Sequence, residues 1–195
     1  MEDIIKAMEE YAVINNIPIM QKEGLQFMQH FIETNNIRTI LELGSAIGYS
    51  AIQMARINKN IRIVTIERDE VRYNEAIKNI EASGLKDQIE IYLADALEFE
   101  TDEVFDMIFI DAAKAQYIKF FERYKNNLDC NGTIISDNLK FHGFVETKER
   151  IKNRNTRQLV GKIRKYITFL EENNDFTTEF ISKGDGIALT KRKVL

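Results

Sequence analysis

The amino-acid sequence predicts an α/β fold in which a largely parallel sheet is covered by helices on both faces. Short, almost continuously apolar segments alternate with segments of helical periodicity, which is the order of parallel βα units. The last two apolar segments flank the turn 183–186, which contains two glycines and predicts an antiparallel hairpin. At 195 residues we expect one domain, 1–195, with a helical extension over 1–35.

The elements follow one another without an internal repeat or a flexible linker. Apolar residues at helical spacing predict two helices before the sheet, with the only proline, Pro18, between them. Apolar runs that meet turn residues predict buried strands, and Gly84 is expected to cap a helix. The expected order is helices over 3–15 and 22–34, a strand over 39–43, a helix over 47–57, a strand over 61–67, a helix over 69–83, strands over 89–93 and 105–110, a helix over 117–127, a strand over 132–136, a long helix over 145–172, and strands over 176–182 and 187–191.

The composition excludes several classes of protein. With 44% hydrophobic and 30% charged residues, the chain is neither disordered nor collagen-like nor a coiled coil. No apolar run reaches the ~18–20 residues that a membrane span needs, so we expect no membrane partner. The single cysteine, Cys130, excludes a disulfide framework and a cysteine-rich zinc site. The acidic first residues lack the features of a secretory signal, and a cytoplasmic protein is expected.

Charge is distributed unevenly along the chain. The total is −4, but the segment 148–165 contains eight Lys and Arg residues against one acid. This basic strip therefore carries +7 in an otherwise acidic protein. Such a strip either contacts a polyanion or is a solvated helix face paired with the acidic body, and charge alone favours neither interpretation.

Ligands of open α/β sheets bind beyond the carboxyl ends of the strands, so the residues there are the functional candidates. The turn after the first strand has glycines four apart, Gly44 and Gly48, which matches neither the dinucleotide fingerprint nor a Walker A loop. Gly44 lets the backbone approach a ligand closely. Ser50 and the N–H groups that open the next helix could hold a carboxylate.

Acidic residues follow the next two strands. A carboxylate at Glu67 can accept both hydroxyls of a ribose, although an acid at the start of a helix has the same sequence signature. Asp95 follows the third strand, where an acid can accept hydrogen bonds from an adenine amino group. Together with the glycine turn, these acids point to an adenosyl ligand.

Hard oxygen ligands follow the fourth and fifth strands. Asp111 ends one strand, and Asp137 and Asn138 end the next. Two carboxylates and a carboxamide suit Mg²⁺ or another divalent cation, which would also offset the repulsion between the carboxylates. Each residue alone is common in turns and helix caps, but the set favours a metal.

These motifs, over about residues 19–191, resemble the cation-dependent O-methyltransferases of the catechol and caffeoyl-CoA type. The resemblance rests on 41–50 (LELGSAIGYS), 109–117 (FIDAAKAQY), Asp137-Asn138 and Gly184-Asp185-Gly186. It implies a seven-stranded class I methyltransferase sheet, Rossmann-like, that binds S-adenosylmethionine, and many such proteins are homodimers. It also implies that Asp111, Asp137 and Asn138 bind the metal, that Lys114 is the catalytic base with Asp111 beside it, and that the cofactor contacts Met20, Glu42, Gly44, Tyr49, Ser50, Glu67, Asp95, Ala96, Asp111 and Tyr117.

Within this family the chain is most similar to the bacterial tRNA 5-hydroxyuridine methyltransferases. The similarity is carried by 17–20 (IPIM), 142–145 (HGFV), 154–157 (RNTR) and 162–164 (KIR), of which the last two lie in the basic strip. It implies methylation of the 5-oxygen of the wobble uridine in a tRNA anticodon loop. The loop's phosphates would then contact Arg154, Arg157, Lys162 and Arg164.

The chemistry of this substrate fits a metal site. The 5-hydroxyl and the 4-carbonyl of 5-hydroxyuracil can chelate a divalent ion as the two oxygens of a catechol do, and the ion lowers the pKa of the hydroxyl. A small catechol-like molecule is the alternative substrate, although the chain has no tryptophan to wall such a site. An RNA-binding protein without turnover is a third interpretation, disfavoured by the intact polar set. His142 closely follows the expected metal ligands and could contact the substrate.

Overall fold

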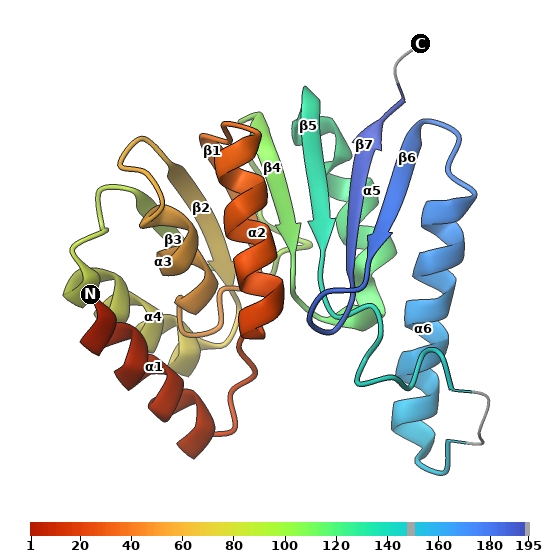
Figure 1. Ribbon diagram of the computed structural model, residues 1–195, viewed down its shortest axis with the longest axis horizontal. Coiled ribbons are helices and arrows are strands. Elements are labelled where there is room, and N and C mark those ends of the chain that lie inside the picture. The colour runs from red at the N-terminus through yellow and green to blue at the C-terminus, as the bar shows by residue number, and fades with distance from the viewer. Residues whose placement is uncertain (148–150, 194–195) are drawn as a thin grey trace.

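The computed structural model describes residues 1–147 and 151–193. Within these residues, a seven-stranded sheet has the order β3-β2-β1-β4-β5-β7-β6 (Figure 1). Its strands are β1 Thr39–Leu43, β2 Arg62–Glu67, β3 Ile89–Leu93, β4 Phe105–Ile110, β5 Leu128–Ser136, β6 Phe176–Ile181 and β7 Ile187–Arg192. The helices are α1 Glu2–Ile14, α2 Lys22–Thr34, α3 Tyr49–Ala55, α4 Glu70–Ser83, α5 Tyr117–Tyr124 and α6 Arg154–Glu171, with 3₁₀ turns η1 Lys114–Gln116 and η2 Lys125–Asn127.

The sheet confirms the predicted fold class. Strands β3, β2, β1, β4 and β5 run parallel, whereas β7 is antiparallel to both β5 and β6. The strand order reverses at β1, because β2 and β3 lie on one side of β1 and β4 lies on its other side. Such a reversal opens a crevice at the carboxyl ends of the strands, which is where an open α/β sheet binds its ligands.

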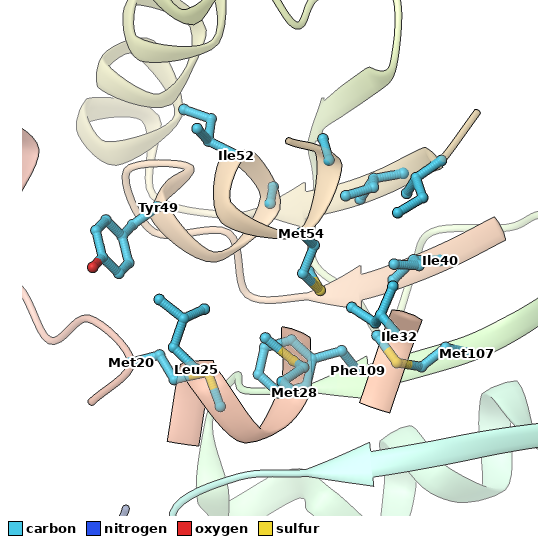
Figure 2. Close-up of a cluster of buried hydrophobic side chains, with 14 of the residues drawn as sticks. Met20, Leu25, Met28, Ile32, Ile40, Tyr49, Ile52, Met54, Met107 and Phe109 are labelled. Carbon is cyan, nitrogen blue, oxygen red and sulfur yellow. The ribbon is translucent and has the colours of Figure 1, made fainter. Parts of the chain in front are cut away.

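Each face of the sheet buries its own apolar core. Helices α1 to α4 cover one face, and α5 and α6 cover the other. In the first core, Met28 and Ile32 of α2 and Met54 of α3 pack over Ile40 of β1 and Phe109 of β4 (Figure 2). These five side chains are at most 1% exposed. Their burial holds the central strands in place, and the site at the strand ends depends on that placement.

The predicted long helix over 145–172 is wrong at its start. Asn153 is the N-cap of α6, where its side chain accepts a hydrogen bond from the Thr156 N–H at 3.0 Å. Residues 145–147 belong to the preceding loop, and 148–150 lie outside the described residues. The charged segment has no apolar periodicity that could mark this boundary. A cap formed by an asparagine side chain sets the start of the helix instead.

The other boundaries differ by smaller amounts. Helix α3 begins and ends two residues inside the predicted range 47–57, and β5 starts four residues before the predicted 132. The predicted helix over 117–127 is α5 followed by η2. Gly84 caps α4 with φ +71°, as predicted. In the described part of the chain, no helix combines the length and apolar character needed to cross a bilayer.

One carboxylate interrupts the apolar pattern of the central strand. Glu42 of β1 is fully buried and accepts hydrogen bonds of 2.5 Å from the hydroxyls of Ser50 and Thr65. Burial raises the pKa of Glu42 to about 7, although the two hydroxyl donors oppose the increase. The group therefore retains its proton in the folded chain at pH values where it is ionised in the unfolded chain.

We predict that Glu42→Gln removes a pH-dependent loss of stability. For a carboxyl whose pKa rises from 4.5 to about 7 on folding, the stabilising contribution is complete below pH 4.5 and is lost as the pH rises to about 7. The wild-type free energy of unfolding should fall by about 3 kcal/mol relative to the variant over this range. Urea unfolding of both proteins between pH 5 and 8 measures the difference, and parallel pH profiles would contradict the prediction.

Candidate active site at the carboxyl ends of the strands

A cavity of about 270 Å³ opens at the carboxyl ends of β1, β2 and β4. Its wall is completed by the α1–α2 connection and by the first turn of α5. The cavity lies at the reversal of strand order described above. It is lined by Pro18, Ile19, Met20, Gly44, Ser45, Ala46, Tyr49, Ser50, Ile66, Glu67, Arg68, Arg72, Ala94, Asp95, Ala96, Asp111, Ala112, Ala113, Lys114, Phe120 and Asn138.

The β1–α3 turn needs its first glycine for steric reasons. Gly44 has φ +98°, and a Cβ added there would lie 2.6 Å from the backbone oxygen of Asp111. Any side chain would thus push the turn away from the end of β4. Gly48, with φ +82°, is the left-handed N-cap of α3. The two glycines bring the turn against Asp111 and form one wall of the cavity.

Ser45 marks where a ligand would complete the turn. Ser45 lines the cavity, and its hydroxyl is buried without a hydrogen-bond partner among the described residues. A buried polar group without a partner is rare in proteins, and a bound molecule commonly provides the partner. The cradle formed by Gly44 and the orphaned hydroxyl of Ser45 together fit a polar ligand such as an amino-acid moiety.

The carboxylate of Glu67 stabilises the loops around the cavity. It accepts three backbone N–H bonds, from Ala46 at 2.8 Å, Arg68 at 2.9 Å and Asp69 at 2.8 Å. The N-cap of α4 is Asp69, and Glu67 lies two residues before it, where its Oε1 accepts the N–H of that cap residue. An ionised carboxylate offers about four acceptor positions, which leaves one for a ligand hydroxyl.

Asp95 lies on the β3 side of the cavity, where its Oδ1 accepts the Leu97 N–H at 2.8 Å. Its other oxygen is 3.9 Å from the guanidinium of Arg68. Ala96 follows it in the cavity wall, and its carbonyl accepts the Tyr124 hydroxyl at 2.7 Å. The acids after β2 and β3 therefore lie along one cavity, as an adenosyl ligand requires.

Other residues predicted to touch the cofactor have their polar atoms engaged within the chain. Ser50 donates to Glu42, which is not in the cavity wall, and Tyr49 donates to Glu9 of α1 at 2.8 Å. Met20 closes the cavity from the α1–α2 connection. Tyr117 is buried outside the cavity wall, and its hydroxyl donates to the backbone oxygen of Asp137 at 3.1 Å.

The predicted metal ligands lie together at the ends of β4 and β5. The Asn138 amide nitrogen donates to Asp111 Oδ1 at 3.0 Å and to Asp137 Oδ2 at 3.1 Å. Burial raises the pKa of both carboxyls, and the charge of Asp137 raises that of Asp111 further. The buried Asp137 and the half-buried Asp111, bridged by an amide, form a set of hard oxygen donors that fits a divalent cation, because a half-turn of the amide presents its oxygen to the same point.

The Asn138 amide is needed to complete the set of oxygen donors, because Asp111 and Asp137 are its only two carboxyls. Among the residues that the structure describes, no three His, Cys, Asp or Glu side chains cluster as a metal site. Lys114 begins η1 and lines the same cavity. Its positive charge opposes the increase in the pKa of Asp111 and Asp137. Lys114, Asp111 and Asn138 therefore line one cavity with the glycine turn, and Asn138 bonds Asp137, which lies outside the cavity wall.

The four basic residues predicted to contact RNA are exposed on α6. The N-terminal half of this helix extends past the carboxyl ends of the strands, beside the loop after β5 (Figure 1). Arg164 donates to the backbone oxygens of Val145 at 2.8 Å and Thr147 at 3.1 Å, so it holds that loop. Arg157 donates to the oxygen of Ile151 at 3.1 Å.

None of these cations pairs with an acid within the described residues. The side chains of Arg154 and Lys162, moreover, make no hydrogen bond to any other described residue. Their positive charge is thus directed to solvent and is not neutralised by the acidic body.

Sequence reasoning missed several residues of the cavity. Ser45 resembles any small turn residue, and only its burial without a partner singles it out. Arg68 and Arg72 follow Glu67 closely, so their place at a strand end was a usable signal. Phe120 comes from α5, and nothing in the sequence indicates which face of that helix reaches the cavity.

Comparison with known proteins places this site in a family. The chain is 37% identical over 137 residues to a catechol O-methyltransferase of Niastella koreensis, which covers 66% of this chain and only 61% of that relative. A structure from Staphylococcus aureus, described as a candidate caffeoyl-CoA O-methyltransferase, is 40% identical with a TM-score of 0.92 and covers 97% of this chain and 92% of that one. An O-methyltransferase from Bacillus cereus in complex with SAH is 27% identical with a TM-score of 0.82 and covers 98% of this chain and 91% of that one. The O-methyltransferase family model matches residues 1–193, and the protein therefore belongs to the O-methyltransferase family.

Proposed function

We propose that the protein is an S-adenosylmethionine- and divalent-cation-dependent O-methyltransferase that methylates the 5-hydroxyl of 5-hydroxyuridine at the tRNA wobble position. The observation that carries the proposal is the cluster of Asp111, Asp137 and Asn138, of which Asp111 and Asn138 line a cavity built from the glycine turn. Relatives named as catechol and caffeoyl-CoA O-methyltransferases support this chemistry. The solved relative in complex with SAH supports the choice of cofactor.

The cavity wall supplies separate positions for the two ends of the cofactor. Ser45 would provide its unpartnered hydroxyl to the polar methionine end, next to the close-packed Gly44. Glu67 would bind a ribose hydroxyl with its remaining acceptor position, and Asp95 lies further along toward the base. When bound, S-adenosylmethionine supplies the methyl group, and a divalent cation lowers the pKa of the hydroxyl that receives it.

The residues of the cluster would orient and deprotonate the substrate. Asp111, Asp137 and Asn138 would hold the cation and thereby fix the position of two neighbouring substrate oxygens. Lys114, on the same wall, would accept the proton of the reacting hydroxyl at its Nζ atom. Tyr117 would keep Asp137 in place through its bond to the backbone oxygen of that residue.

The exposed strip on α6 favours a nucleic-acid substrate over a small molecule. Unpaired cations beside the site can bind the phosphates of an anticodon loop, whose unpaired base can be extruded into a pocket at modest energetic cost. A small catechol-like molecule, the second candidate substrate, is favoured by the relative's name and has no use for this strip.

A direct assay distinguishes the two substrates. Labelled S-adenosylmethionine is offered with tRNA that contains 5-hydroxyuridine, with unhydroxylated tRNA, or with catechol, each with and without a chelator. We expect label in the hydroxylated tRNA only, and none in the presence of the chelator. Transfer to catechol alone would replace the tRNA proposal by the small-molecule one, and transfer in excess chelator would contradict the role of the cation.

We predict that Asp137→Asn lowers kcat/KM at least 100-fold without destabilising the protein. The variant removes one charged ligand of the cation and also relieves the repulsion that raises the pKa of the Asp111 carboxyl. Methyl transfer at several cation concentrations and thermal unfolding measure the two effects. Asp175→Asn, which changes an exposed acid on the α6–β6 turn, is the control, and equal activity of the two variants would sink the cation proposal.

We predict that Glu67→Gln weakens S-adenosylmethionine binding about 10-fold, because a charge-assisted hydrogen bond to the ribose is worth ~1.5–3 kcal/mol. Calorimetry gives the dissociation constant for wild type and variant. The amide keeps one oxygen acceptor for the neighbouring N–H groups, and an unfolding curve checks that the loops remain stable. An unchanged dissociation constant would leave Glu67 as a structural residue only.

We predict that Arg154→Gln and Lys162→Gln each weaken tRNA binding and lower its salt dependence. For every phosphate that the variant no longer neutralises, the slope of log K against log salt should fall by roughly 0.7–0.9. Lys86→Gln, in the exposed turn after α4, is the matched control. Titration of tRNA at several salt concentrations gives the slopes, and wild-type slopes in both strip variants would favour the small-molecule substrate.

A further inference from the structure

The turn between β6 and β7 is bonded to the segment that follows the metal-ligand cluster. The backbone oxygen of Asp185 accepts the Lys140 N–H at 2.7 Å, and that of Gly186 accepts the Leu139 N–H at 3.0 Å. The carboxylate of Asp185 adds a third bond, because its Oδ1 accepts the His142 N–H at 2.6 Å. Three hydrogen bonds thus connect residues more than forty positions apart, directly after Asn138.

The bonded segment has a backbone that few residues adopt without support. Asn138, Phe141 and His142 have φ of +65°, +45° and +55°, and Gly143 has φ +80°. Positive φ costs a non-glycine residue of order 1–3 kcal/mol and persists only where its surroundings fix it. The bonds from the turn at residues 183–186 provide that support. They hold Asn138 between β5 and a fixed Leu139.

The carboxylate of Asp185 is not used elsewhere in the fold. The residue is 6% exposed, and its Oδ2 atom is buried without a hydrogen-bond partner among the described residues. The ring nitrogen Nδ1 of His142 lies 3.7 Å from this Oδ2 atom. A buried acid of this kind is costly, and its one short bond is to the backbone of the strained segment.

The turn at residues 183–186 is packed tightly between Lys140 on one side and α2 on the other. A Cβ on Gly186 would lie 2.7 Å from Cγ of Lys140, and a Cβ on Gly184 would lie 3.2 Å from the backbone nitrogen of Gly24 in α2. Gly24 in turn packs against Met20, which closes the cavity. The turn therefore has little freedom to move away from the segment it holds.

We propose that Asp185 is a positioning residue that fixes the metal ligand Asn138 by bonding the strained segment 139–142 to the β6–β7 turn. The proposal rests on the proposed function, because it takes Asn138 to be a cation ligand. Arg164 fixes the far end of the same loop through its bonds to Val145 and Thr147. The described segment 139–147 is therefore held near both of its ends, and Asn138, which directly precedes it, carries the amide of the site.

The Asp185→Ala variant tests the hydrogen bond to the His142 N–H. The Asp185→Asn variant separates the effect of that hydrogen bond from the effect of the negative charge. The alanine removes the acceptor for the His142 N–H, so the dissociation constant for Mg²⁺ or Mn²⁺ should rise at least 10-fold while that for S-adenosylmethionine stays unchanged. The asparagine keeps an oxygen acceptor, and its NH₂ group can donate to neutral His142 Nδ1. It should therefore bind the cation within threefold of wild type.

The control is Asp106→Ala, at the opposite end of β4. Asp106 Oδ2 also accepts backbone N–H groups, from Arg38 at 2.7 Å and Thr39 at 2.9 Å, but lies far along the strand from the cavity. This variant should be less stable and bind the cation normally. Wild-type cation affinity in a folded Asp185→Ala protein, or an equal loss in the asparagine and alanine variants, would overturn the proposal.

A measurement on the wild-type protein needs no variant. If the segment and the cation site are coupled, cation binding must slow hydrogen exchange at the His142 amide, because coupling between two sites is reciprocal. We expect at least a 10-fold slowing in Mg²⁺ or Mn²⁺ and none at the Arg38 amide. Cation binding without protection of His142 would contradict the role of Asp185, whereas a wild-type protein that binds no cation would contradict the proposed function.

Discussion

The site depends on two carboxyl groups that the sheet holds side by side, one buried and one half-buried. Ile110 of β4 pairs with Ser136 of β5, so the residues after this pair, Asp111 and Asp137, necessarily leave the sheet side by side. The fold surrounds them with low-polarity structure, which raises the pKa of both. A single amide, from Asn138, and the positive charge of Lys114 reduce the repulsion, and a divalent cation would remove it.

The surrounding elements are arranged to keep this costly pair in place. Tyr117 bonds the backbone of Asp137, and Gly44 packs a turn against the backbone of Asp111 with no space for a side chain. The wall that accommodates a cofactor is therefore continuous with the wall that holds the cation cluster. A methyl donor and a cation-bound oxygen would meet across one cavity, so that binding alone supplies much of the orientation that methyl transfer needs.

The sequence predicts the sheet well because its central strands, β1, β2 and β4, are buried on both faces. Apolar runs such as 39–43 and 105–110 can be recognised as strands without tertiary information. The polar residues that follow such runs are therefore placed at the strand ends from the sequence alone. The roles that were missed depend on contacts between distant parts of the chain. Asp185 acts on a segment 43 positions away, and Ser45 differs from other turn residues only by its unpartnered hydroxyl. The start of α6 was missed because a charged segment has no apolar period to show where a helix begins.

The residues proposed for chemistry and those proposed for substrate choice lie in different parts of the structure. The residues proposed for catalysis directly follow the strands, where the strand register and the close packing of the glycine turn fix their positions. The residues that would select a substrate lie on the exposed face of α6, which does not take part in the sheet. Changes on that surface would alter neither the pairing of β4 with β5 nor the cluster at their ends. Membership in the O-methyltransferase family therefore constrains the reaction far more closely than it constrains the molecule that receives the methyl group.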